Sequence, residues 1–228
     1  MAELYQLYLG FVYRVDLICN TTVYNYVGDD VHSPSDEEFI STEYCYTFVH
    51  SALEDFVESI STKFCDLMIP LFLKTKIPNS CVLSLALLDS VDLSKTEKNE
   101  IEAGKKNDNY DTHFVFIEEK IKLCRKKLGR IISNNNGVSR KYIVNILPYV
   151  GIDMPNPLLV DRVDQIAAKR GYFAHKFKEG IKNATTANEA FDACVSALSF
   201  ATELYKNAKN QYEDYLRIIE NISSSKTT

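Results

Sequence analysis

The sequence predicts an all-α protein, built as an antiparallel helical bundle with long first and last helices. Three observations support this prediction. Apolar residues recur at steps of three and four over long stretches, helix-capping patterns precede those stretches, and no segment shows sustained strand-like alternation. The chain has 228 residues, of which 46% are hydrophobic and 25% charged, and these proportions are typical of a globular domain.

Residues 1–34 form an N-terminal extension in which helix and strand signals compete. Between positions 4 and 27 the β-branched and aromatic residues are dense, which is typical of strands, but the spacing of the apolar residues fits a helix about as well as a strand. We favour a helix. The stretch lacks the basic start and cleavage site of a secretory signal, and Glu3, Arg14 and Asp16 interrupt its apolar runs. We therefore expect no export, no membrane contact and a cytoplasmic location.

A helical domain is expected over residues 35–222, with a frayed tail at 223–228. Its first long helix follows a capping box that Ser35 opens. Pro70 and Pro78 should kink or stop this helix. Its apolar positions, mostly three or four residues apart, are Phe39, Tyr46, Val49, Leu53, Phe56, Ile60, Phe64, Leu67 and Leu71.

The next segments carry their own helix signals. Residues 80–92 predict a short, very apolar helix, and a capping box at Ser94 leads a polar helix. From Thr112 the helical pattern sharpens, and a turn from Asn134 to Gly137 ends it. The apolar positions of that helix are Phe114, Ile117, Ile121, Cys124, Leu128 and Ile131.

Three more helices complete the expected bundle. Ser139 caps a short helix, and the Pro-Asn-Pro at 155–157 sets the start of a helix that runs to about residue 177. A capping box at Thr186 precedes the last helix. From Leu198 that helix follows a heptad formed by Ala201, Tyr205, Ala208, Tyr212, Tyr215, Ile219 and Ile222.

The composition excludes several classes of protein. The net charge of −5 excludes a basic surface that coats nucleic acid nonspecifically, but leaves room for a local basic site. The six cysteines form no C-x-x-C pair and the four histidines stand singly. We therefore expect free, buried thiols and neither a metal site nor a cofactor.

Arg170 and His175 form an R-x-x-x-x-H pair in the helix that follows the Pro-Asn-Pro. Arg170 continues the apolar stripe of that helix, so its charge should face the core and needs a partner. Glu54 and Asp164 are the two candidate carboxylates, and an anionic ligand is the alternative. In a straight helix His175 lies about 140° around the axis from Arg170, so the two side chains converge only if the helix deforms, which Gly171 would permit.

Three parts of the chain resemble the HEPN superfamily (higher eukaryotes and prokaryotes nucleotide-binding domains), particularly its bacterial RNA-cleaving branches. They are SALEDFVESI at 51–60, LGRIISNNNGVSRKYIVNILPYVGID at 128–153 and RGYFAH at 170–175. Two positions depart from the family pattern. Gly171 stands where members commonly carry a polar residue, often Asn, and Phe177 stands where some short toxins carry a modifiable Tyr.

The resemblance implies a metal-independent endoribonuclease that dimerises and brings two Arg-His pairs into one cleft. His175 would be the general acid or base, and Arg170 would stabilise charge on the phosphorane. Lys169, Lys176 and Lys178 flank the motif and are the expected contacts to RNA phosphates.

In a cell, the same resemblance implies a toxin or antiviral defence effector that cuts tRNA or other RNA. Its expected partners are a second copy of the chain and an antitoxin or defence-system protein. The alternative is a catalytically silent HEPN module that binds nucleotide or RNA, or that serves only for dimerisation. The basic stretch from Lys120 to Arg130 fits either a solvated helix face or a further RNA contact.

Overall fold

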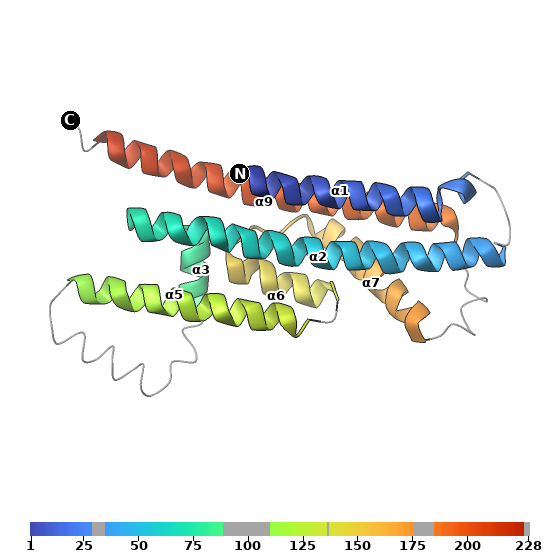
Figure 1. Ribbon diagram of the computed structural model, residues 1–228, viewed down its shortest axis with the longest axis horizontal. Coiled ribbons are helices and arrows are strands. Elements are labelled where there is room, and N and C mark those ends of the chain that lie inside the picture. Colours follow the sequence, from blue (N-terminus) through green and yellow to red (C-terminus); the bar gives the residue numbers. More distant parts are fainter. Residues whose placement is uncertain (29–34, 89–109, 136, 176–184, 226–228) are drawn as a thin grey trace. The chain divides into compact units, whose positions relative to one another are not determined.

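The computed structural model describes residues 1–28, 35–88, 110–135, 137–175 and 185–225 (Figure 1). Within these ranges the regular elements are seven α-helices and one 3₁₀ turn, which confirms the predicted all-α class. No helix in the described ranges is both long and apolar enough to span a bilayer. The polar helix predicted from Ser94 lies outside the described residues.

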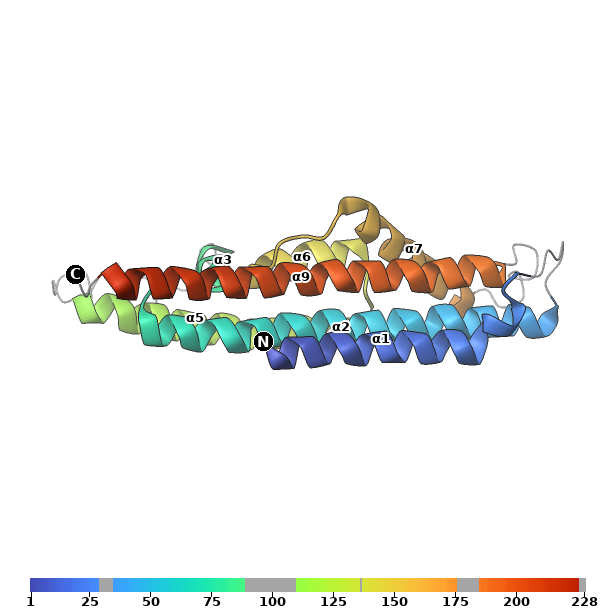
Figure 2. The same ribbon diagram turned by 90° about the horizontal axis from the view of Figure 1, so that it is seen from above.

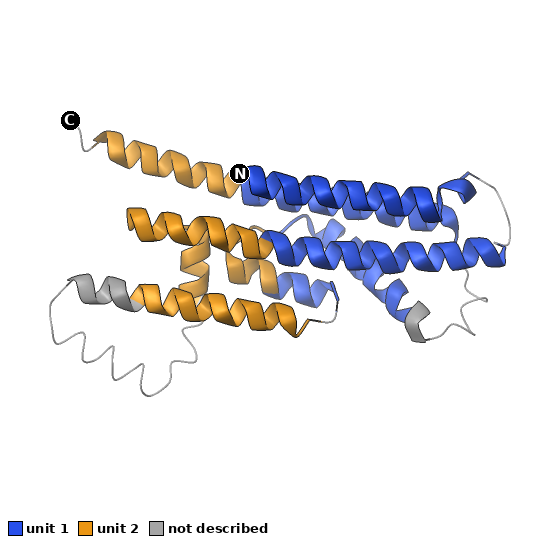
Figure 3. Ribbon diagram, in the orientation of Figure 1, with its two compact units in different colours: residues 1–60, 136–145, 154–209 blue, residues 61–135, 146–153, 210–228 orange. Residues whose placement is uncertain are grey.

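The chain divides into two compact units (Figure 3). Unit 1 contains residues 1–60, 136–145 and 154–209, and unit 2 contains residues 61–135, 146–153 and 210–228. Three helices contribute residues to both units: α2 (Asp36–Thr75), α6 (Arg140–Val150) and α9 (Ala187–Ser225).

The N-terminal segment is a helix, α1 (Ala2–Thr22), followed by the 3₁₀ turn η1 (Tyr24–Tyr26). In unit 1, α1 lies along α2 and α9 (Figure 2). The Phe11 ring packs against Phe56 of α2 with centroids 4.9 Å apart, and Tyr8 stacks on Tyr205 of α9 at the same separation. Tyr8 also shares a hydrogen bond of 3.0 Å with the hydroxyl of Thr202. These contacts give α1 the buried face that an amphipathic helix requires.

Helix α2 begins where the capping box predicts, because Ser35 Oγ accepts a hydrogen bond from the Glu38 N–H at 3.1 Å. The helix then passes through Pro70 and ends at Thr75. Met68 and Phe72, on either side of the proline, are 1% and 2% exposed. Their burial in unit 2 holds the helix across a residue that cannot donate a backbone hydrogen bond.

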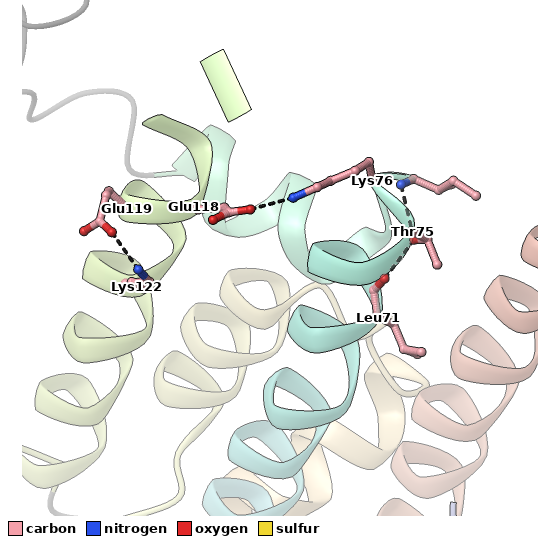
Figure 4. A network of polar contacts seen from close by, with 7 residues as sticks. Leu71, Thr75, Lys76, Glu118, Glu119 and Lys122 are labelled. Atoms are coloured by element: carbon pink, nitrogen blue, oxygen red, sulfur yellow. Dashed lines mark hydrogen bonds and ion pairs between the residues drawn. The ribbon is translucent and has the colours of Figure 1, made fainter. Parts of the chain in front are cut away.

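Polar contacts within unit 2 fix the end of α2 (Figure 4). Lys76 has a φ of 59°, which turns the chain out of the helix, and its Nζ pairs with Glu118 Oε1 of α5 (Tyr110–Ser133) at 2.6 Å. The Tyr215 hydroxyl donates to the Ile77 carbonyl at 2.5 Å. Thr75 Oγ1 donates to the Leu71 carbonyl at 2.8 Å and accepts from the Ile77 N–H at 3.3 Å.

Asn79 caps the short helix α3 (Ser80–Leu88). Asn79 is buried, and its Oδ1 accepts a hydrogen bond from the Val82 N–H at 3.0 Å while its Nδ2 donates to the Met68 carbonyl at 2.9 Å. One side chain therefore starts α3 and ties it to α2.

The predicted starts of the last three helices are confirmed. Ser139 Oγ accepts from the Tyr142 N–H at 3.3 Å at the start of α6, and Asn156 Oδ1 accepts from the Leu158 N–H at 2.9 Å at the start of α7 (Pro157–His175). In α9 the capping box is reciprocal, since Thr186 and Glu189 each accept a hydrogen bond from the other's backbone N–H, at 3.2 and 3.3 Å.

The heptad of α9 is buried over only part of its length. Ala201, Ala208 and Tyr215 are buried, whereas Ile222 is 38% exposed. The helix continues to Ser225, three residues into the segment expected to fray.

The six cysteines are free and buried, as predicted. In unit 1 the Sγ atoms of Cys45 and Cys194 lie 3.4 Å apart, and in unit 2 those of Cys65 and Cys81 lie 3.6 Å apart.

Candidate functional site

Arg170 lies near the end of α7, half-buried, in unit 1. Its positive charge acts on two side chains of α2, His50 and Glu54. These two residues are four positions apart and therefore share one face of α2. The charge of Arg170 acts to lower the pKa of Glu54, one of the two carboxylates proposed for it from the sequence.

Asp164, the other proposed carboxylate, holds the start of α6. Its Oδ1 accepts a hydrogen bond from the Arg140 N–H at 2.8 Å, at a helix end that favours negative charge. The Arg140 guanidinium also pairs with Asp161, one turn earlier on α7. The two aspartates together join the beginning of α6 to the middle of α7.

His50 is 3% exposed and fixed in place. Its Nε2 accepts a hydrogen bond from the Val138 N–H at 3.2 Å. Burial, assisted by the positive charge of Arg170, lowers the pKa of His50 to about 4. The ring is therefore neutral at pH 7 with its proton on Nδ1, and its Nε2 lone pair is already used. His50 is a positioning group in this arrangement and not a proton shuttle.

The turn before α6 closes over this part of α2. Gly137 has a φ of +138°, and a Cβ built on it would lie 2.7 Å from Cε1 of His50. Its backbone N–H forms a hydrogen bond that lowers the pKa of Glu54, and the next N–H, that of Val138, is bound by His50. The backbone N–H groups of Gly137 and Val138 therefore bind Glu54 and His50, which lie one turn apart on the same face of α2. Only glycine fits at position 137, because a side chain there would collide with the His50 ring.

Glu54 and Glu58 form an acidic pair beside Arg170. Burial and the charge of Glu58 raise the pKa of Glu54, and Arg170 and the Gly137 N–H oppose this rise. The Tyr142 hydroxyl donates to Glu58 Oε1 at 3.2 Å, and burial together with Glu58 raises the pKa of Tyr142. We refer to His50, Glu54, Glu58, Tyr142 and Arg170 as the Arg170 cluster.

Sequence reasoning gave no site role to His50, Glu58 or Tyr142. His50, Glu54 and Glu58 recur every four residues along α2, and His50 is buried among the apolar positions of the helix. That polar ridge was a signal that could have identified them.

The backbone of α7 is α-helical through Gly171 to His175, so the deformation that convergence of Arg170 and His175 would require is not present in the described backbone. The Cα atoms of Arg170 and His175 are therefore about 140° apart around the helix axis. A Cβ on Gly171 would meet nothing within 4 Å. The His175 side chain, and all of Lys176 and Lys178, lie outside the described residues.

Lys169 faces α9 across a cavity of about 800 Å³ within unit 1. Its Nζ donates to Thr185 Oγ1 at 2.8 Å. Two tyrosines, Tyr46 and Tyr172, line the cavity with residues of both charge signs. The charged lining residues are Arg162, Lys169, Glu189 and Asp192. Such a lining suits a ligand that combines an aromatic ring, hydrogen-bonding edges and an anionic group.

No cluster of three or more His, Cys, Asp or Glu side chains suited to a metal ion occurs among the residues that the structure describes. The chemistry available to the described part of the site is that of a half-buried guanidinium, two carboxyl groups, a phenol hydroxyl and a neutral imidazole.

Comparison with known proteins gives a family match over most of the chain. The family model described as RiboL-PSP-HEPN matches residues 21–224. No significant match was found among curated proteins or among solved structures. The matched region contains every residue of the Arg170 cluster, as well as His175 and Lys169.

Proposed function

Because the chain belongs to the RiboL-PSP-HEPN family, we propose that it is an endoribonuclease that cleaves RNA without a metal ion. Membership of a HEPN family supports an RNA-cleaving or nucleotide-binding module. The observation that carries the proposal of cleavage is the placement of Arg170, half-buried on α7 and electrostatically coupled to Glu54 and His50 of α2.

In this proposal Arg170 binds the scissile phosphate. A guanidinium has five N–H donors in a fixed plane, so part of it can be oriented by Glu54 while the exposed part meets phosphate oxygens. His50 is neutral at pH 7 and adds no second positive charge that would displace Arg170. A positioned cation of this kind stabilises the charge that builds on the phosphorane when a 2′-OH attacks the phosphorus.

His175 is the proposed general acid or base, because histidine is the side chain whose ordinary pKa lies near neutrality. Its Cα lies on a different side of α7 from that of Arg170. We therefore propose that a homodimer supplies the cleft, with Arg170 and His175 contributed by both copies. Lys169, Lys176 and Lys178 are the proposed contacts to the flanking phosphates.

The test is RNA cleavage in the presence of EDTA. We expect wild-type protein to cleave, His175→Ala to lose activity by 10²- to 10⁴-fold, and Arg170→Lys to lose about 10²-fold or more. Arg217→Lys is the matched control, because this arginine is an exposed residue of unit 2 whose side chain is 69% accessible, and it should leave the rate unchanged. Cleavage that EDTA abolishes, or that survives His175→Ala, would refute the mechanism.

A nucleotide-binding module without nuclease activity is the second candidate. The cavity beside Lys169 favours it, since two tyrosines and a lysine suit a base and a phosphate. Gly171 also favours it, because family members commonly place a polar residue there. Saturable nucleotide binding that Lys169→Ala weakens, in a protein that cleaves no RNA, would decide for this candidate.

For the cellular role we propose a toxin or antiviral defence effector that acts on tRNA or other cellular RNA and is restrained by a partner protein. The family resemblance supports this role. Induced expression of wild-type protein should arrest growth of a bacterial host, and Arg170→Lys expressed to the same level should not. Equal growth arrest by the two proteins would contradict a nuclease toxin.

A further inference from the structure

The outward face of α1 carries a ridge of large, exposed side chains. Tyr5, Leu9, Tyr13 and Leu17 are 45%, 38%, 67% and 48% exposed. They are four residues apart, so they form one of the i±4 ridges along which helices pack against each other. Two charged residues lie between Tyr5 and Asn20 of α1: Asp16, which is exposed, and Arg14, whose side chain is 43% accessible.

The neighbouring helix of unit 1 carries a second row of exposed apolar side chains. Ile40, Tyr44 and Phe48 of α2 recur with the same four-residue spacing and are 41%, 54% and 49% exposed. Tyr44 and Phe48 stack on each other at the surface with ring centroids 5.9 Å apart. α1 and α2 are joined at their exposed edge by the Arg14–Asp55 ion pair of 2.5 Å.

The amount of exposed apolar surface is that of an interface. Seven large side chains that are each about half exposed present roughly 600 to 700 Å². The largest apolar patch of a typical monomer is about 300–600 Å², whereas a standard interface buries about 800 Å² on each partner. The face formed by Tyr5, Leu9, Tyr13, Leu17, Ile40, Tyr44 and Phe48, called the α1 face below, therefore approaches the size that a stable dimer needs.

The order of residues along the α1 ridge is self-complementary. The pattern Tyr5, Leu9, Tyr13, Leu17 is centred on position 11. If a second α1 crosses in the antiparallel direction about that centre, Tyr5 of each copy meets Leu17 of the other, and Leu9 meets Tyr13. Each contact pairs a tyrosine ring with a leucine. Each contact also occurs twice, once from each copy, as a two-fold interface between identical patches requires.

Gly10 lies next to the centre of this ridge, and no contact among the described residues requires a glycine there. A Cβ built on Gly10 would meet nothing within 4 Å. A glycine inside a helix costs roughly 0.5–1 kcal/mol relative to alanine. At the crossing point of two helices, however, the missing side chain allows the backbones to approach closely.

From these observations we propose that the α1 face binds a second copy of this chain, with the two α1 helices antiparallel and crossing near Gly10. The α1 row of this face precedes the region that matches the family at residues 21–224, whereas its α2 row lies within that region. It is separate from the cleft proposed for Arg170 and His175, and it does not depend on nuclease activity.

The test is the mass of the full-length particle by light scattering and sedimentation over a range of concentrations. The chain mass is 26.0 kDa, and we expect wild-type particles to contain an even number of chains. Leu9→Asp combined with Tyr13→Asp should halve that number, because two unpaired carboxylates would be buried in each half of the interface. Leu158→Asp is the matched control, since Leu158 is 72% exposed on another helix of unit 1, and it should leave the mass unchanged.

A second variant separates loss of the interface from loss of the fold. Gly10→Leu places a side chain in open space within one chain, so the helical circular dichroism of the folded chain should be kept, while the particle mass should fall. The register is tested by mixing Leu9→Cys and Tyr13→Cys chains with the oxidant diamide, because all native cysteines are buried. The mixture should give more disulfide-linked dimer than either variant alone.

Three results would overturn this proposal. One is a wild-type particle with the mass of a single chain at every concentration. Another is an unchanged mass after the Leu9→Asp and Tyr13→Asp substitutions. The third is preferential linkage of like with like in the cysteine experiment. RNA cleavage measured on the same proteins reports separately on the proposed nuclease, so failure of one proposal leaves the other open to its own test.

Discussion

Stability should fall steeply in mild acid because His50 is buried in its neutral form. The pKa of His50 is about 4 in the folded chain, whereas its ordinary value is 6.5. Between these two values the unfolded chain binds a proton that the folded chain excludes. This contribution to stability is therefore complete above pH 6.5 and is lost as the pH falls toward 4.

The magnitude follows from the two pKa values. Each pH unit between the two pKa values changes the free energy of unfolding by about 1.36 kcal/mol. Relative to its value above pH 6.5, that free energy is lower by about 2 kcal/mol at pH 5 and by about 3 kcal/mol at pH 4. Glu43 and Glu54 act in the opposite direction, because burial raises the pKa of each in the folded chain. A comparison of wild-type protein with a His50 variant that keeps both glutamates removes most of their effect.

His50→Gln is the appropriate variant, since the glutamine amide oxygen can accept the Val138 N–H in place of Nε2 but does not titrate. We would measure urea unfolding by circular dichroism at pH 7 and pH 5. The free energy of unfolding of the variant should be below that of wild type at pH 7. The gap between the two values should shrink by about 2 kcal/mol at pH 5, because only wild type is destabilised by protonation of His50. A difference that is the same at both pH values would refute the assignment of His50 as a buried neutral base.

Three further predictions concern single features of the fold. Gly137→Ala should lower the free energy of unfolding in urea by about 2 kcal/mol or more, because Gly137 has a positive φ and lies against the His50 ring. Gly171→Ala should raise it by up to about 1 kcal/mol, because Gly171 lies in a helix with open space around it. Equal effects of the two substitutions would contradict the turn geometry at Gly137. Thr186→Ala should cost about 1 kcal/mol by the same measurement through loss of the α9 cap, and an unchanged midpoint would argue against the capping box. The six thiols should react with Ellman's reagent far more slowly in folded than in urea-unfolded protein, and rapid labelling of the folded chain would show that they are accessible.

Local signals predicted most of the helix starts, because a capping side chain and its backbone partner are close together in the sequence. Ser35, Ser139 and Thr186 were identified in this way. The choice between helix and strand for α1 could not be made locally, since it depends on packing against Phe56 and Tyr205. The path of α2 through Pro70 likewise depends on the burial of its flanking residues.

The sequence indicates only part of the candidate site, and the roles given to its residues stay predictions. Arg170 was identified because a charge interrupts an apolar stripe, and Glu54 was named as a partner for it. Asp164 is an equal candidate from the sequence, and in the structure its Oδ1 accepts a hydrogen bond from the Arg140 N–H, 24 positions away. His50 was missed because its hydrogen-bond partner Val138 is 88 positions away, and no local pattern reports such a contact.

The interleaving of the two units has a consequence for synthesis on the ribosome. Unit 1 includes residues up to 209, and unit 2 includes residues from 210 onward as well as 61–135. Neither unit can therefore be completed until nearly the whole polypeptide has been translated, and contacts so distant in sequence also slow folding. A message truncated before α9 would yield a product in which both units are incomplete. We expect such nascent chains to lack the Tyr46–Glu189 and Tyr8–Thr202 contacts and to be substrates for proteolysis rather than partly active proteins.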